Sequence, residues 1–372
     1  MSEPGTTAFR GIAALAGHFV LQPGQSESIT GTRPIAGAGL LSQLLRGHHF
    51  AATQARLGHV FTLCAHAHQR ASALAFAAAW PADTQEVKPQ PLPLALLRWE
   101  TARDHLRSIA LEWPLRLNDP SLQLAAMEWL RTCPVSMAGT AQPSVHQSWA
   151  DLSALNTWLE ANASFARQCL ARWSARGKNL AVPLRTLHVL NDDAVAQQHH
   201  LRCLGEAIAT VPGFTQTPQW QGACAETGPW TRLRHARETP ASNLVSTEAR
   251  LAARWQELLD IAAAPALKDD ATQDPLLSSG AQVLGHGEAI AWCEMARGLL
   301  FHWVQLDSHG AVAQYRVLAP TEWNFHPQGA LAQVLSSCHA HDTVAAQTLS
   351  AAFDPCVECS VVALPPQEPS HA

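Results

Sequence analysis

Two cysteines near the end of the chain have the spacing of a metal-binding or redox pair. They lie in the stretch Asp354-Pro355-Cys356-Val357-Glu358-Cys359. Thiolates separated by two residues can bind one soft metal ion together. A zinc ribbon would need a second Cys-x-x-Cys pair, and the sequence has none. A thioredoxin-like redox pair normally follows an early strand rather than closing a long chain. The pair therefore indicates a soft-metal site whose other ligands come from elsewhere.

A second set of candidate ligands lies far upstream, between His59 and His68. Phe61, Cys64 and His68 follow one another at i, i+3 and i+7, which places them on one face of a helix. Cys64 and His68 are four residues apart and are therefore neighbours on that face. By spacing alone, His68 is more simply explained as a core histidine that hydrogen-bonds a backbone carbonyl.

The elements that must position these residues are mostly helical. Residues 50–80 form one long Ala-rich stretch without proline, which predicts a single helix. Residues 8–33 look extended, and Asp307-Ser308-His309-Gly310 predicts a hairpin turn between residues 299–306 and 311–318. The sequence predicts an α+β, mostly α protein with a small β region. Further helices are expected at residues 94–112, 122–131, 152–175, 247–263, 330–337 and 343–352.

Composition restricts the function classes. The chain has 372 residues, 47% hydrophobic and 15% charged, with a net charge of −5 and no basic run, which argues against nucleic acid as a partner. No apolar run reaches the ~20 residues of a membrane helix, and the N-terminus does not resemble a secretory signal. Scattered cysteines in such a chain suggest cytosolic thiols, so we expect a cytoplasmic protein. Six cysteines without motif context are expected to be small buried hydrophobes: Cys133, Cys169, Cys203, Cys224, Cys293 and Cys338.

The two cysteine stretches together resemble the motifs of the large subunit of nickel–iron hydrogenases, C-x-x-C-x-x-x-H near the start and D-P-C-x-x-C at the end. Three more stretches resemble that family in the same order: residues 226–232 (E-T-G-P-L-A-R in the family), 294–298 (E-A-P-R-G) and 320–324 (P-T-x-W-N). The chain is identified as a member of this superfamily. The resemblance implies a single large-subunit-like domain over residues 1–372, with a helical core and a β region formed by N-terminal and C-terminal strands. The last ten residues form a Pro-rich tail that is expected to be mobile.

The resemblance also implies roles for the cysteines. In the family, the second cysteine of each motif bridges iron and nickel, and the first binds nickel alone. By position, Cys64 and Cys359 match the bridging ligands and Cys356 matches one nickel ligand. Phe61 stands where the other nickel ligand belongs, and a phenyl ring cannot coordinate a metal. The resemblance therefore implies a metal site between the helix around residues 50–80 and the terminal motif, with iron but no nickel.

Other positions match groups that surround the iron. Family iron carries two cyanides and one carbon monoxide, and Arg297 and Thr321, with Pro320 beside it, match the donors to the cyanides. Such donors make physical sense, since a cyanide buried without a partner is costly. Without the resemblance, Arg297 would be assigned to an ion pair with Glu294 or Glu322. His68 is expected to lie next to the metal ligands without coordinating the metal itself. His49 replaces the glutamate that relays protons in active enzymes.

This combination resembles the HupK/HoxV-type hydrogenase accessory proteins. The resemblance implies a non-catalytic scaffold that holds Fe(CN)2(CO) in transit and passes it to a hydrogenase large-subunit apoprotein. Iron-delivering maturation chaperones are the expected source of the unit, and neither nucleic acid nor membrane insertion is expected. One alternative is a degenerate adaptor or structural subunit of a hydrogenase complex. A catalytic large subunit is another, although it would need the missing thiolate and the missing glutamate.

Overall fold

The computed structural model describes eight stretches of the chain. The predicted Pro-rich tail lies outside the described residues except for Ala363, and so does the part of the predicted N-terminal extended region before Gly17. Among the described residues, no helix is long and apolar enough to cross a membrane. The described stretches are 17–35, 39–81, 87–137, 143–177, 180–190, 193–235, 244–268 and 271–363.

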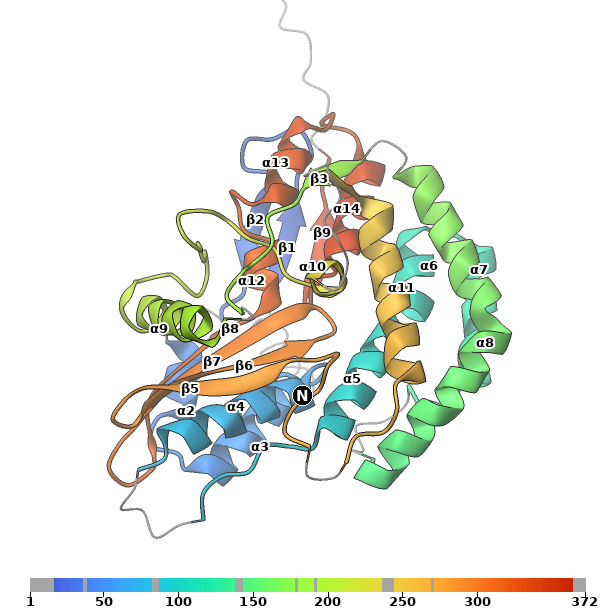
Figure 1. Ribbon diagram of the computed structural model, residues 1–372. Helices are drawn as coiled ribbons and strands as arrows, with labels where there is room; N and C mark the ends of the chain where they lie inside the picture. Colours follow the sequence, from blue (N-terminus) through green and yellow to red (C-terminus); the bar gives the residue numbers. More distant parts are fainter. Residues whose placement is uncertain are drawn as a thin grey trace, which may run out of the picture.

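A layer of long helices forms one half of the molecule (Figure 1). Its main members, α5 (Leu94–Arg107), α8 (Val145–Arg176) and α11 (Thr247–Ala263), lie side by side. The helix α5 runs on through a π-helical turn, η1 (Ser108–Glu112), as the predicted helix over residues 94–112 implied. Around this layer lie α6 (Trp113–Arg116), α7 (Pro120–Arg131) and α10 (Pro229–His235).

A four-stranded antiparallel sheet forms the other half, in the order β5-β6-β7-β8. The predicted hairpin is confirmed as β7 and β8, and its partners β5 and β6 extend it. The helix α4 packs against one face of the sheet and α9 against the other, so β6 and β7 are buried on both faces. The bounds are β5 (Ser279–Gly285), β6 (Glu288–Met295), β7 (Gly298–Leu306), β8 (Val312–Leu318), α4 (Ala65–Ala79) and α9 (Ala194–Thr210).

A second sheet brings the two ends of the described chain together. In the order β2-β1-β9, strand β1 (His18–Leu21) pairs with β2 (Ile29–Thr32) and, in parallel, with β9 (Glu358–Val361). This pairing confirms the predicted β region of N-terminal and C-terminal strands. Because Phe19 is the register partner of Cys359, the terminal cysteine motif is fixed to the start of the chain.

The smaller elements complete the fold. The helices α13 and α14 cover the β2-β1-β9 sheet, and α12 follows directly after β8. The predicted helices at residues 330–337 and 343–352 are thereby confirmed. The remaining bounds are α2 (Leu40–Leu45), α3 (Phe50–Val60), β3 (Ala181–Pro183), β4 (Leu244–Ser246), α12 (Pro320–Asn324), α13 (Ala330–Ser337) and α14 (Thr343–Phe353).

The single helix predicted over residues 50–80 is wrong. The chain leaves helical geometry at Phe61 (φ −109°, ψ 62°) and at Cys64 (φ −130°, ψ 37°), so α3 ends before Phe61 and α4 begins after Cys64. Helix propensity and the absence of proline favoured continuity, but tertiary contacts at the break override a weak local preference. The consequence is functional, because Cys64 lies at the N-terminal end of a helix rather than in its middle.

The helix α9 was not predicted from the sequence. Its apolar positions Leu201, Leu204 and Ile208 are buried against the sheet. They follow helical spacing, but a polar, His-rich surface separates them and weakens the pattern in the sequence. The side chain of Asp193 accepts hydrogen bonds from the first turn, which is a start signal that the sequence does contain.

Candidate metal-binding site

Cys64 and Cys356 come together although 292 positions separate them in the sequence (356 − 64). The Cys64 side chain is buried, and the two sulfurs are close enough to interact electrostatically. Burial, followed by the nearby Cys356 and Glu100, raises the pKa of Cys64 well above its ordinary value. Sγ of Cys356 lies 2.7 Å from Oγ1 of Thr321, so the predicted cyanide donor contacts the cysteine motif directly.

Cys359 faces a different set of side chains. Its thiol hydrogen-bonds Ser350 and lies near Arg116, while burial raises its pKa. Oγ of Ser350 in turn accepts a hydrogen bond of 2.8 Å from Nη1 of Arg116. Across the stretches that the structure describes, no group of three or more His, Cys, Asp or Glu side chains is arranged to hold a metal ion. The structure thus brings together Cys64 and Cys356, and the three-cysteine set remains a prediction.

Phe61 and His68 form the wall behind Cys64. Their rings stack with centroids 3.6 Å apart and an interplanar angle of 3°. Nδ1 of His68 lies 3.0 Å from Nε2 of His302, whose Nδ1 lies 2.6 Å from the hydroxyl of Tyr315. Burial lowers the pKa of His302 to about 3 and that of His68 well below its ordinary value. Both rings are therefore neutral, and His68 bonds another histidine rather than the backbone carbonyl that its spacing suggested.

Glu100 from α5 holds the start of the helix that follows Cys64. Its carboxylate oxygens accept hydrogen bonds of 2.7 and 3.0 Å from the backbone N–H groups of His66 and Ala67. These are two of the N–H groups that a helix start leaves without internal partners. Because Glu100 satisfies them, the Cys64 side chain at the N-cap position makes no capping bond. Burial raises the pKa of Glu100 to about 8.

Arg297 pairs with Asp104 and Asp354 rather than with Glu294 or Glu322. Nη1 of Arg297 donates to Oδ2 of Asp104, and its Nε lies 3.2 Å from Oδ2 of Asp354. The guanidinium is 2% exposed, yet its Nη2 has no hydrogen-bond partner among the described residues. A buried N–H without a partner is costly. Nε of Arg297, although it lies near Asp354, also lacks a hydrogen-bond partner in the part of the chain that the structure describes, so Nη2 is a donor available for an additional acceptor.

The Arg297 pairs belong to a longer buried chain of charges. Oδ2 of Asp354 also forms an ion pair with Nη2 of Arg254 at 2.9 Å, and Nη1 of Arg254 donates to Nδ1 of His105 at 3.1 Å. Nε2 of His105 then lies 2.7 Å from Oε2 of Glu257. Glu257 accepts two hydrogen bonds of 2.7 Å each from Arg232. The series contains three arginines and three carboxylates, and His105 links Arg254 to Glu257. Asp354 lies between Arg297 and Arg254 and immediately precedes the cysteine motif.

The stretch at residues 226–232, to which the sequence assigned no chemistry, holds Arg297 in place. Thr227 and Asn324 exchange hydrogen bonds of 2.9 Å each, and Oγ1 of Thr227 accepts from the backbone N–H of Leu299. Gly298 has φ +131°, and a Cβ there would approach Thr227 to 2.7 Å. Only glycine fits between Thr227 and the arginine turn.

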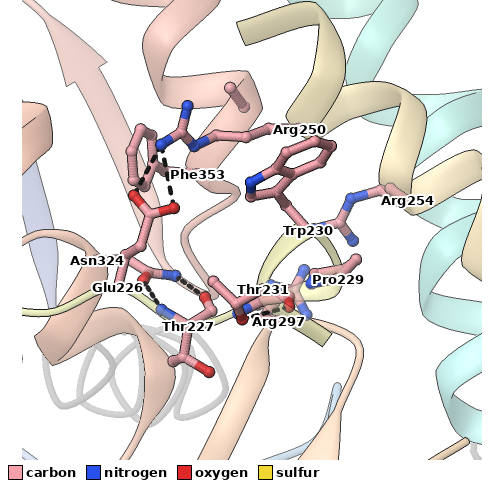
Figure 2. A pocket seen from close by; sticks show the side chains of 12 residues that line it. Glu226, Thr227, Pro229, Trp230, Thr231, Arg250, Arg254, Arg297, Asn324 and Phe353 are labelled. Carbon is pink, nitrogen blue, oxygen red and sulfur yellow. Dashed lines mark hydrogen bonds and ion pairs between the residues drawn. The ribbon is translucent and has the colours of Figure 1, made fainter. Parts of the chain in front are cut away.

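Figure 2 shows this stretch around a small cavity of about 30 Å³, with Trp230 between Arg250 and Arg254. Glu226 pairs with Arg250 through contacts of 2.9 and 3.0 Å. Arg297 lines the same cavity, which at this volume is large enough for about one water molecule. The stretch therefore acts as a rigid support behind Arg297.

A second arginine approaches the two cysteines from the N-terminal side. Arg33 is 7% exposed, and its Nη1 lies 2.7 Å from Oε1 of Glu322. Burial opposes the charge of Arg33, but Glu322, Cys356 and Cys64 together raise its pKa above the ordinary value. Arg33 and Arg297 both interact electrostatically with Cys356, so two cations lie near this thiol.

Several residues of this site were not predicted from the sequence. Glu100 and Asp104 are four residues apart and therefore lie on the same side of α5, which is a spacing that the sequence does contain. Arg254 follows the same logic on α11. Arg33, between a short strand and Pro34, carries no pattern that could have singled it out.

The fold is that of the nickel-dependent hydrogenases. Residues 231–362 match the nickel-dependent hydrogenase family. The chain also superposes on the Ni-Fe-Se hydrogenase of D. vulgaris Hildenborough in its reduced state with a TM-score of 0.55. That match covers 88% of this chain and 92% of the other at 14% identity, so it establishes the fold alone.

Within this fold class, the chain belongs to the family of hydrogenase expression/formation proteins that includes HoxV and HupK. It is 34% identical to the hydrogenase expression/formation protein HoxV of Cupriavidus necator, over 94% of this chain and 96% of that protein. It is 29% identical to the protein HupK of Rhizobium leguminosarum bv. viciae, over 81% of this chain and 83% of that one. The family that the sequence motifs predicted is confirmed.

The buried charge chain predicts a specific acid sensitivity. Burial alone would raise the pKa of Glu257, but the charge of Arg232 and the hydrogen bonds from His105 and Arg232 lower it to about 2. An unfolded glutamate titrates at about 4.3, so Glu257 stabilises the fold above that pH, and its contribution is lost as the pH falls towards about 2. This contribution is on the order of 3 kcal/mol at neutral pH.

We expect Glu257→Gln to lower the free energy of unfolding strongly at pH 7. The difference from the wild type should shrink as the pH falls from about 4.3 towards about 2, because Glu257 of the unfolded chain binds a proton in this range before Glu257 of the folded protein does. Urea denaturation at several pH values measures this. Glu128→Gln, which removes an exposed ion pair with Arg131, is the matched control and should change little. Parallel pH curves for wild type and Glu257→Gln would contradict the assignment.

Proposed function

We propose that this protein is a non-catalytic hydrogenase maturation factor that holds an Fe(CN)2(CO) unit and passes it to a hydrogenase large-subunit apoprotein. Membership of the expression/formation family supports the accessory role. The finer proposal is supported by the electrostatic interaction of Cys64 with Cys356, of Arg33 with both thiols and of Arg297 with Cys356, and by the contact of Cys356 with Thr321. Maturation chaperones that deliver the unit are the proposed donors. The cytoplasm is the proposed compartment, and all nine cysteines are free thiols.

The charge of the bound unit follows from its ligands. Divalent iron with two cyanides and one carbon monoxide is neutral, so binding to two thiolates gives a complex of charge −2. Arg33 and Arg297 are two cations that interact electrostatically with Cys356, and each also has carboxylate partners. Cations beside a thiolate stabilise its charged form. The free Nη2 of Arg297 can donate to one cyanide nitrogen, which is an acceptor suited to a buried charged donor.

Thr321 and Cys359 would change partners when the unit binds. The Thr321 hydroxyl now contacts Cys356, and in the proposed complex it turns to the second cyanide. We assign Cys64 and Cys356 to the first capture of the unit. Cys359 joins as a third ligand only after leaving Ser350. Pro320 sets the start of α12, so that the neighbouring Thr321 points into the site.

The weakness of this ligand set suits transfer rather than storage. Because burial raises the pKa of Cys64, its thiol holds a proton in the free protein, and binding of the metal must release that proton. A cleft of about 360 Å³ lies beside the Cys64 turn and is lined by Thr62, Leu63, Glu100 and Arg103, among others. This cleft offers a route by which a donor or acceptor protein reaches the site.

The alternatives differ in what they require of the same residues. A catalytic large subunit needs a fourth thiolate and nickel, but Phe61 fills the corresponding position and stacks on His68. An adaptor without cargo needs neither thiol, and it gives no reason for two buried arginines beside them. The non-catalytic scaffold uses every one of these features.

We expect anaerobically purified protein, made in cells with all hydrogenase accessory factors, to contain iron but no stoichiometric nickel. Phe61 removes the soft ligand on which nickel retention depends. Elemental analysis, together with infrared bands in the cyanide and carbonyl stretching regions, measures this. Stoichiometric nickel would contradict the scaffold proposal, and the absence of both iron and infrared bands would favour the adaptor.

Single cysteine variants separate the ligands. Cys64→Ser and Cys356→Ser should abolish the infrared bands, since a serine hydroxyl is too hard and too weakly acidic to hold low-spin iron. Cys359→Ser should retain weakened bands, and Cys169→Ser, which alters a buried thiol remote from the motifs, is the control. If Cys359→Ser abolished the bands and Cys356→Ser did not, the capture pair would be Cys64 with Cys359, as the family motif implied. Full iron content in Cys64→Ser would contradict the thiolate mechanism.

A further inference from the structure

One cysteine that was expected to be a small buried hydrophobe is exposed instead. Cys203 lies on the outer face of α9, one turn after His199, and both side chains are exposed. Sγ of Cys203 lies 3.7 Å from Nε2 of His199. Residues at i and i+4 on a helix face the same direction, and this spacing is a recurring way to present two ligands to one metal ion.

The separation of the two ligand atoms fits a chelated metal. A tetrahedral ion of the zinc type binds sulfur at about 2.3 Å and imidazole nitrogen at about 2.0–2.1 Å, which sets the two ligand atoms about 3.5 Å apart. The observed 3.7 Å differs from this by only a few tenths of an ångström. The metal would therefore bind without a change in the helix backbone.

The helix that carries the pair is firmly held. Leu201, Leu204 and Ile208 are buried on its opposite face, against the four-stranded sheet. Nη1 of Arg202, between the two candidate ligands, donates to the backbone carbonyl of Leu284 at 3.1 Å. A ligand pair on a rigid element loses little conformational freedom when it binds.

A second cysteine–histidine pair shows what such a site requires. Sγ of Cys224 lies 3.2 Å from Nδ1 of His326, but both residues are buried. That Nδ1 also accepts a hydrogen bond of 3.0 Å from the backbone N–H of Gln328. Its lone pair is already used, so this pair is a structural contact. His199 and Cys203 are both open to solvent.

We propose that His199 and Cys203 form a two-ligand surface site for a borderline-soft divalent cation of the zinc, cobalt or nickel class. Imidazole and thiolate are the ligands that select these ions over magnesium or calcium. Two positions of the tetrahedron remain open to water or to ligands from another molecule. The site is separate from the cysteine pair of the iron proposal and does not depend on it.

Cobalt(II) is the probe that tests this site, because a thiolate bound to cobalt gives a charge-transfer absorption in the near ultraviolet. Titration of the full-length protein under reducing, oxygen-free conditions should give this band with saturation at one equivalent, and zinc should displace it. Cys203→Ser should lose the band. His199→Ala should weaken binding on the order of 100-fold, since the chelate loses its second, intramolecular contact.

Controls distinguish this site from the other thiols and histidines. Cys64→Ser and Cys338→Ser should keep the band, because Cys338 is engaged with the backbone carbonyl of Val334. His146→Ala tests a histidine without a cysteine one turn away. A band that persists in Cys203→Ser, cobalt affinity unchanged in His199→Ala, or no band in the wild type would each overturn the proposal. All three outcomes leave the iron proposal untouched.

Discussion

The position of Asp354 is the constraint on which the site depends. This carboxylate lies between Arg254 and Arg297, and its backbone adopts a left-handed conformation (φ 44°, ψ 75°) directly before the cysteine motif. Such a conformation is unfavourable for a residue other than glycine, so the surrounding contacts must stabilise it. The two arginines do so, and burial of a single carboxylate without them would be prohibitive. The ion pairs thus decide where Cys356 lies.

The same charges tie together four separate parts of the chain. Arg254 comes from α11, Asp104 from α5, and Arg297 from the turn between β6 and β7, while Asp354 follows α14. Buried ion pairs add little net stability compared with apolar packing, although breaking one leaves an expensive unpaired charge. We interpret the role of this network as positional: the ion pairs fix the free donor of Arg297 relative to the thiols. Close to Cys64 in the sequence, the stacked rings of Phe61 and His68 add neutral groups.

The motifs in the sequence predicted the family, the α+β class and the meeting of the chain ends, because short motifs and helical periodicity are local signals. The same motifs singled out Cys64, Cys356, Arg297 and Thr321, and their assignment to a metal site stays a prediction. The break before Cys64 could not be predicted, since it depends on Glu100, a residue of another helix. Nor could the partners of Arg297 be predicted, because Asp104 and Asp354 are far from it in sequence. The contact of Cys359 with Ser350 could not be predicted either, because it follows from the pairing of β9 with β1, which is a long-range contact.

The most direct test of the central claim is the infrared spectrum of the iron-loaded Arg297→Lys protein beside that of the wild type. Lysine keeps a positive charge but lacks the fixed fork of donors that lets Arg297 pair with two carboxylates and keep Nη2 free of a partner among the described residues. If Arg297 donates to a bound cyanide, the cyanide stretching bands should shift in the variant, while the carbonyl band shifts less. Bands that are present and identical in both proteins would contradict the account.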